Sequence, residues 1–288
     1  MSKSFGLQLL QQKPLAEPTA SFAGKTIIVT GANSGLGLEA ATKFVALGAT
    51  RVILGVRDLE KGNAARRSIE KRTGRRDAAE VWHLDMNWYP SIRAFAKQAE
   101  ALEQLDVAVL NAGVYMVDYQ TSPHGWEETL QVNAVSTTLL ALLLLPKLRV
   151  SRNGAGVPVL EVVTSRRAEA VTIPPEQRQG NILASLNNPD TFQSSLQYRA
   201  SKFLALCSVK MIASSVQPTE VIVLAVCPGA AASSLSRGWT GALASIVKSL
   251  LNAFFLRTPE QGARSLVSGV TIGADAHGNF WYDDQLHE

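Results

Sequence analysis

The stretch Thr26-Ile27-Ile28-Val29-Thr30-Gly31-Ala32-Asn33-Ser34-Gly35-Leu36-Gly37 decides the fold. Its first part is a short apolar run of the kind that forms a buried strand, and a helical pattern over 38–47 follows the glycines. Gly31 permits a tight turn, Gly35 lets backbone amides approach a pyrophosphate, and Gly37 allows the helix to pack closely with its positive end toward the anion. The sequence therefore predicts a dinucleotide site, and a plain strand-to-helix turn is the alternative.

Apolar runs alternate with helical patterns along the rest of the chain. This alternation predicts a single-domain, doubly wound α/β fold of the Rossmann type, with a parallel sheet covered by helices on both faces. Ligands of such folds bind at the carboxyl ends of the strands. We expect an amino-terminal arm over residues 1–23 and one dinucleotide-binding catalytic domain over residues 24–288. The predicted strands cover 26–29, 51–56, 81–84, 107–110, 158–163 and 221–226.

The composition excludes several classes of protein. With 46% hydrophobic and 18% charged residues, the 288-residue chain is typical of a soluble globular protein. Six basic residues between Arg66 and Arg76 lack the interleaved aromatic residues of a nucleic-acid surface, so we expect a solvated helix face there. The apolar run Leu139 to Leu145 is too short to cross a bilayer and indicates a buried core helix. We expect neither a nucleic-acid partner nor stable membrane insertion.

The cysteines and histidines show no pattern typical of a metal site. Cys207 and Cys227 are the two cysteines, and the four histidines lack ligand spacing, so we predict no metal and no disulfide framework. This cysteine usage indicates a reducing setting, and the polar amino terminus is unlike a secretory signal. We therefore expect a cytoplasmic protein.

Tyr198 and Lys202 stand four residues apart in a predicted helix. Side chains at this spacing share one helical face, so an ammonium group beside a phenol is expected to lower the pKa of the phenol. A tyrosine tuned in this way can exchange protons with a carbonyl group near neutral pH.

The end of the second predicted strand reads Gly55-Val56-Arg57-Asp58. An arginine at this place can pair with the 2′-phosphate of NADP(H), whereas an acid accepts hydrogen bonds from the ribose hydroxyls of NAD(H). Val56 followed by Arg57 favours NADP(H), and Asp58 leaves NAD(H) open. A solvated surface arginine is the structural alternative for Arg57.

Further motifs resemble those of the short-chain dehydrogenase/reductase family. They follow the glycine loop in the family's order and cover residues 24 to about 275. The stretches 55–62 and 258–263 look most like the retinol-dehydrogenase-like branch, particularly its members from fungal secondary-metabolite pathways. The motifs are Leu84-Asp85-Met86, Asn111-Ala112-Gly113, Asn133 within Gln-Val-Asn-Ala, Thr164-Ser165, Tyr198-x-x-x-Lys202 and Pro228-Gly229.

The resemblance implies a set of cofactor contacts along the chain. Asp85 and Met86 would hold the adenine, although Asp85 alone could equally cap the next helix. Ser233, where the family commonly has threonine, would contact the nicotinamide end. The full expected set is Gly31, Asn33, Ser34, Gly35, Leu36, Gly37, Arg57, Asp85, Met86, Asn111, Ala112, Gly113, Tyr198, Lys202, Pro228, Gly229 and Ser233.

The resemblance also implies four catalytic residues. Tyr198 would act as general acid in carbonyl reduction, and Lys202 would bind the nicotinamide ribose and stabilise the phenolate. Ser165 would donate a hydrogen bond to the carbonyl oxygen, and Asn133 would hold a water that links Lys202 to solvent. Family members are often dimers or tetramers, so a homo-oligomer is an open expectation.

Two segments interrupt the alternation of strands and helices. We expect residues 166–197 and 230–257 to form substrate lids, with a plain surface insertion as the alternative for the first. Arg166 and Arg167 follow Ser165 and either recognise an anionic or polar substrate or face water, while Cys227 is expected to be a packed residue. An apolar stripe in the second segment favours a mostly apolar ligand, although core packing explains it equally well; it contains Leu235, Trp239, Leu243, Ile246, Leu250 and Phe254.

Together these features predict an oxidoreductase that uses NADP(H) to interconvert a carbonyl and an alcohol on a mostly apolar small molecule, as ketoreductases do. The alternative is a dinucleotide-binding sensor or scaffold without redox chemistry. A regulator has no chemical need for Asn133, Ser165, Tyr198 and Lys202 together, so the enzyme is the favoured hypothesis.

Overall fold

The computed structural model describes residues 14–152, 156–175, 178, 180–231 and 257–287. These residues form one sheet with the strand order β3-β2-β1-β4-β5-β6-β7-β8. Because β1 pairs with β2 on one side and with β4 on the other, the strand order reverses there and opens a crevice at the carboxyl ends. The strands are β1 Thr26–Thr30, β2 Arg51–Val56, β3 Ala79–His83, β4 Val107–Leu110, β5 Val159–Val163, β6 Ile222–Val226, β7 Phe280–Tyr282 and β8 Gln285–His287.

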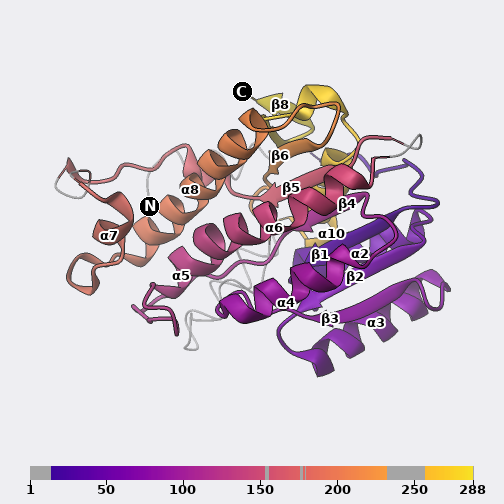
Figure 1. Ribbon diagram of the computed structural model, residues 1–288, viewed down its shortest axis with the longest axis horizontal. Coiled ribbons are helices and arrows are strands. Elements are labelled where there is room, and N and C mark those ends of the chain that lie inside the picture. The colour runs from indigo at the N-terminus through magenta and orange to yellow at the C-terminus, as the bar shows by residue number, and fades with distance from the viewer. Residues whose placement is uncertain (1–13, 153–155, 176–177, 179, 232–256, 288) are drawn as a thin grey trace.

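Helices cover both faces of the sheet (Figure 1). One face carries α2 Gly35–Ala46, α3 Leu59–Thr73 and α10 Pro259–Gly269, and the other carries α4 Tyr89–Glu100, α6 Thr137–Val150 and α8 Ser194–Ser214. Shorter helices follow the strand ends, namely α5 Glu128–Leu130, the π-helix η1 Gln131–Ser136, the 3-10 helix η2 Arg166–Ala168 and α7 Ile182–Leu186.

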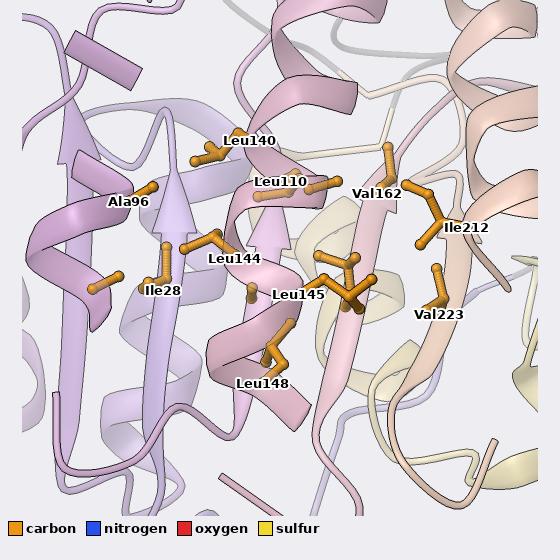
Figure 2. Packing of buried hydrophobic residues seen from close by; sticks show 14 of the residues in the cluster. Ile28, Ala96, Leu110, Leu140, Leu144, Leu145, Leu148, Val162, Ile212 and Val223 are labelled. Carbon is orange, nitrogen blue, oxygen red and sulfur yellow. The ribbon is translucent and has the colours of Figure 1, made fainter. Parts of the chain in front are cut away.

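Alternate residues of each central strand belong to different core clusters. Ile27 and Val29 of β1 pack beneath α2 and α10, whereas Ile28 packs with the leucines of α6. Figure 2 shows this second cluster, in which Leu140, Leu144, Leu145 and Leu148 lie over the sheet. Burial on both faces explains why the strands read as continuous apolar runs.

The segment from α5 to α6 has the length and apolar composition of a membrane-spanning helix. Residues Glu128–Val150 are long and apolar enough, yet 67% of the most apolar window is buried inside the domain. This burial is typical of a core helix, as predicted for the run from Leu139 to Leu145.

The structure confirms the doubly wound fold and differs from the sequence expectations at one edge of the sheet. All six predicted strands are present, with β3 starting two residues earlier than expected. The added strands are β7, which is parallel to β6, and β8, which is antiparallel to β7. Each has only three residues, too few for a period to be visible in the sequence.

Residues 14–23 lie against the helices of one face. Leu15 is buried, and its carbonyl oxygen accepts a 3.0 Å hydrogen bond from Arg264 of α10. Arg264 also pairs with Glu17 at 3.0 Å. This part of the amino-terminal arm is therefore attached to α10.

The basic cluster between Arg66 and Arg76 is only partly a solvated face. Arg67 and Lys71 are exposed as expected. Arg72 pairs with Glu39 of α2, and Arg75 donates a 2.7 Å hydrogen bond to the carbonyl oxygen of Val45. These contacts attach α3 to α2.

Candidate active site

A cleft of about 490 Å³ lies at the carboxyl ends of the parallel strands. Most of the predicted cofactor residues line it. Gly37 and Gly229 do not line the cleft, and Ser233 is outside the described residues. The predicted residues that line it are Gly31, Asn33, Ser34, Gly35, Leu36, Arg57, Asp85, Met86, Asn111, Ala112, Gly113, Tyr198, Lys202 and Pro228.

The glycine loop has the close backbone packing that a pyrophosphate site requires. Gly31 adopts a φ of 65°, and a Cβ atom on Gly37 would lie 2.6 Å from the carbonyl oxygen of Gly31. Ser34 is the N-cap of α2 and makes no side-chain capping hydrogen bond. The first amide groups of α2 therefore remain available to an anion, so the loop fits the diphosphate of a dinucleotide.

Hydrogen bonds from the loop after β4 hold it against β1. Asn111 donates from Nδ2 to the carbonyl oxygen of Thr30, and the amide of Ala112 donates to Oγ1 of Thr30, both at 2.9 Å. A Cβ atom on Gly31 would lie 3.0 Å from the Cα atom of Ala112. The two loops thus form one continuous floor to the cleft.

Asp85 lies at the cleft wall after β3. Its carboxylate accepts a 2.9 Å hydrogen bond from the amide of Asn87, and its own amide donates to Ser91. The N-cap of α4 is Trp88, so Asp85 stabilises a turn before the helix instead of capping the helix itself.

The carboxylate beside Arg57 is already engaged by its own helix. Asp58 is the N-cap of α3 and accepts hydrogen bonds from the amides of Glu60 and Lys61, both at 3.1 Å. Its second oxygen pairs with Nζ of Lys61 at 2.6 Å, and this hydrogen bond lowers the pKa of Asp58. Arg57 is exposed and lines the cleft.

Asn133 lies behind the cleft in the π-helix η1. Its Oδ1 accepts a 2.9 Å hydrogen bond from the amide of Val114, and its Nδ2 donates to the carbonyl oxygen of Val114 and to Oγ of Ser201. The Asn133 side chain therefore fixes the wall that follows Gly113.

Tyr198 and Lys202 lie on α8 and both line the cleft, with Lys202 buried and Tyr198 half-buried. Lys202 donates from Nζ to the carbonyl oxygen of Val163 at 2.9 Å, while Oγ1 of Thr164 donates to the carbonyl oxygen of Lys202 at 2.8 Å. A Cβ atom on Gly113 would lie 3.4 Å from Nζ of Lys202. The lysine thus lies between the end of β5 and the cleft floor.

Burial determines the pKa of both groups. It raises the pKa of Tyr198 to about 12, and a hydrogen bond with Ser165 and the charge of Arg167 act in the opposite direction. Burial lowers the pKa of Lys202 to about 8. The expectation of a lowered phenol pKa is wrong, because desolvation outweighs the nearby charges.

Ser165 ends the loop after β5 beside Tyr198. Its Oγ accepts a 3.3 Å hydrogen bond from the amide of Arg167 and contacts the phenol of Tyr198. Nearby, the buried Cys227 accepts hydrogen bonds at Sγ from the amides of Arg166 and Gly229, both at 3.4 Å, and burial raises its pKa. A neutral thiol with these contacts is a packing residue, as expected.

Arg166 contacts the turn between β7 and β8. Its guanidinium pairs with Asp283 at 2.8 Å and lies over the ring of Tyr282, with Cζ 4.4 Å from the centroid. A carboxylate and a ring from the β7–β8 turn therefore hold Arg166, which the sequence interpretation did not foresee.

Tyr115 is a cleft residue that the sequence interpretation missed. Its ring centroid lies 5.3 Å from that of Tyr198, and its hydroxyl donates to Oγ of Ser194 at 3.4 Å. Its position two residues after Gly113 was the available signal. Lys61 was also missed, although it lines the same cleft from α3.

The first predicted lid packs on the domain. Leu186 of α7 is buried with Leu130 and Ala200, and the carbonyl oxygen of Asn187 accepts a 2.9 Å hydrogen bond from Tyr119. The second predicted lid and its apolar stripe from Leu235 to Phe254 lie almost wholly outside the described residues.

Comparisons with known proteins identify the family. The family model for short chain dehydrogenases matches residues 25–173. The short-chain dehydrogenase/reductase phmF of Phaeosphaeria nodorum is 45% identical over 276 residues, which cover 95% of this chain and 81% of the relative. The relative ffsI of Aspergillus flavipes is 45% identical over 278 residues, with the same coverage of 95% and 81%.

A solved structure supports the fold. The NADP active-site complex of RhlG from Pseudomonas aeruginosa superposes with a TM-score of 0.69 at 24% identity, covering 92% of this chain and 96% of that one. The chain therefore belongs to the short-chain dehydrogenase/reductase family and is an NAD(P)-dependent oxidoreductase.

Proposed function

We propose that this protein uses NADP(H) to interconvert a carbonyl and an alcohol on a mostly apolar small molecule, as a ketoreductase-like enzyme of fungal secondary metabolism. The observation that carries this proposal is that Tyr198 and Lys202 line the cleft together, with Ser165 hydrogen-bonded to the phenol. A site of this kind offers a proton donor, a cation and a hydroxyl to one carbonyl oxygen.

The cleft residues would hold the cofactor along its length. The amides at the start of α2 would bind the diphosphate, and Asp85 and Met86 would hold the adenine. Asn111, Ala112 and Gly113 would support the floor, while Pro228 and Gly229 would border the nicotinamide end together with Ser233.

Two features support NADP(H) over NAD(H). Arg57 lies at the cleft where a 2′-phosphate would be recognised, and an arginine suits a phosphate through two parallel hydrogen bonds. Asp58 is engaged by the amides of α3 and by Lys61, so fewer of its acceptor sites remain for ribose hydroxyls. The bound NADP of the RhlG complex agrees with this preference.

When bound, a reduced nicotinamide supplies a hydride to the carbonyl carbon. Tyr198 then donates its hydroxyl proton to the carbonyl oxygen, and its pKa of about 12 keeps the phenol protonated for this task at neutral pH. Ser165 donates a hydrogen bond to the same oxygen as negative charge develops there. The positive charge of Lys202 stabilises the phenolate that remains.

Asn133 holds the wall next to Lys202 through its two hydrogen bonds with Val114. We propose that the space beside this wall admits a water that returns a proton to Lys202 and Tyr198. The substrate would lie against Tyr115, Met116 and Val117, which give the cleft an aromatic and apolar wall.

A comparison of tyrosine variants tests the proposal. Purified protein is incubated with NADPH and a panel of lipophilic ketones, and oxidation of NADPH is followed by absorbance. We expect ketone-dependent oxidation by the wild type and a loss of about 100-fold or more in Tyr198→Phe, because the general acid is removed.

Tyr89→Phe is the matched control, since Tyr89 stacks on His124 outside the cleft. It should retain wild-type turnover. Binding of NADPH without turnover of any ketone or alcohol would instead support the sensor or scaffold alternative. A cytoplasmic location and a homo-oligomer remain predictions, which cell fractionation and size-exclusion chromatography with light scattering would check.

A further inference from the structure

Three charged side chains meet at the carboxyl-terminal edge of the sheet. Asp283 pairs with Arg166 through Oδ2 at 2.8 Å and with Arg257 through Oδ1 at 2.7 Å. The side chains of Asp283 and Arg257 are 15% and 6% exposed, so this carboxylate is the counter-charge of a buried guanidinium. We call Arg166, Asp283 and Arg257 the edge triad.

The turn between β7 and β8 presents Asp283 to the two arginines. Asp283 and Asp284 have φ angles of 52° and 54°, as in the two-residue turns that connect antiparallel strands. Aspartate tolerates this left-handed backbone better than most residues. Tyr282 precedes the turn, and its ring lies against the guanidinium of Arg166.

Each arginine of the edge triad is joined to a loop at the cleft. Arg166 directly follows Ser165, and its amide donates to Sγ of Cys227. Arg257 donates from Nη1 to the carbonyl oxygen of Pro228 at 3.2 Å, and its amide donates to the carbonyl oxygen of Ala230 at 2.9 Å. The triad therefore connects the residue after the proposed carbonyl-binding serine with the loop at the proposed nicotinamide end.

We propose that Asp283 is a positioning residue that fixes the Ser165 loop and the Pro228–Gly229 loop relative to each other. This inference rests on the proposed function, which assigns the nicotinamide end of the cofactor to that loop. Asp283 lies outside the cleft lining and acts through the two arginines.

The charge of Asp283 is the feature that matters. Replacing it by an amide of the same size removes the counter-charge that the two guanidinium groups share, and so weakens the contact that holds the buried Arg257 at the turn. We then expect the guanidinium of Arg257 to shift and its hydrogen bond to the carbonyl oxygen of Pro228 to weaken. The loop at the nicotinamide end loses its anchor, whereas the glycine loop and the Arg57 region keep theirs.

Binding of the whole cofactor and of its adenine half separates this role from general stability. Calorimetry measures the affinity of the wild type and of Asp283→Asn for two ligands. The first is the cofactor that the wild type binds more tightly, and the second is the adenine-containing fragment of that cofactor. The fragment is 2′,5′-ADP for NADPH or AMP for NADH. We expect Asp283→Asn to weaken cofactor binding about fivefold, the worth of about one hydrogen bond, with fragment binding unchanged within about twofold.

Asp284→Asn is the matched control, because Asp284 shares the turn but accepts its hydrogen bond from the amide of Ala16. It should bind both ligands as the wild type does, and Asp283→Glu should recover part of the lost affinity. If Asp283→Asn does not fold, Arg166→Gln leaves Arg257 paired and should show the same selective loss to a smaller extent.

Equal weakening of cofactor and fragment binding, or no weakening of either by a folded variant, would overturn the inference. These measurements need no turnover. A failure of the proposed chemistry would appear in the ketone assay with Tyr198→Phe. The binding measurements on Asp283→Asn could still be interpreted in that case.

Discussion

Lys202 donates a hydrogen bond from Nζ to the carbonyl oxygen of Val163 at 2.9 Å, and this contact holds the amine beneath the end of β5, two residues before Ser165. The amine is buried, and burial lowers its pKa to about 8. Lys202 is therefore mostly protonated and positively charged below about pH 8, and it loses this charge as the pH rises above that value.

We predict that kcat/KM for carbonyl reduction falls as the pH rises above about 8. Tyr198 has a pKa of about 12 and stays protonated through this range, so its titration does not cause the decline. Initial rates from about pH 6 to about pH 10 at constant ionic strength would measure it. In Lys202→Arg the guanidinium cannot lose its proton, so any remaining activity should lack this decline. A decline at the same pH in that variant would assign it to another group.

Arg57→Ala should reduce the preference for NADPH. Loss of a charge-assisted contact with a 2′-phosphate is expected to lower kcat/KM for NADPH about tenfold to about 100-fold, with little change for NADH. Steady-state kinetics with both cofactors would show this. Arg67→Ala removes the same charge from an exposed position outside the cleft and serves as the control. An unchanged cofactor ratio in Arg57→Ala would remove Arg57 from the site.

Glu161→Gln should stabilise the fold increasingly as the pH rises. Glu161 is fully buried in β5, and neither carboxylate oxygen has a hydrogen-bond partner among the described residues. Burial raises its pKa well above the usual range, so the folded protein holds a proton that the unfolded chain releases above about pH 4.5. The resulting stability is present at low pH and is lost as the pH rises toward the folded pKa.

Thermal unfolding of Glu161→Gln and wild type at about pH 5 and about pH 8 would test this, since each kcal/mol corresponds to roughly 2–4 °C for a domain of this size. The advantage of the variant should be larger at the higher pH. Glu103→Gln, at an exposed position, should show no such trend. A pH-independent difference would mean that Glu161 does not titrate between the two states.

The fold was predictable from the sequence because its signals are local. A strand buried on both faces reads as an apolar run, and the glycine loop marks the first strand-to-helix turn, so β1, β2 and β4 were predicted to within one residue. The β7–β8 hairpin was missed because it depends on a salt-bridged turn instead of a sequence period. Its pairing with β6 is a long-range contact.

The site was predictable as a set of positions but not in its energetics. The spacing of Tyr198 and Lys202 placed both in the cleft, yet spacing carries no information on burial, which sets both pKa values. The ion pair of Arg166 was missed for a related reason. Its partner Asp283 is distant in sequence, and only the folded chain shows that the guanidinium is occupied.

The π-helix Gln131–Ser136 gives the chain an unusual sensitivity around Asn133. Its wider turn contains an additional residue compared with the α-helix that continues as α6. Removing one residue other than Asn133 from this hexapeptide would take out the extra residue of the wide turn and change the position of Asn133 within it. We expect this change to break the hydrogen bonds between Asn133 and Val114, although Asn133 itself is not replaced. Single-residue deletions within this segment should therefore reduce activity far more than conservative substitutions of the same residues.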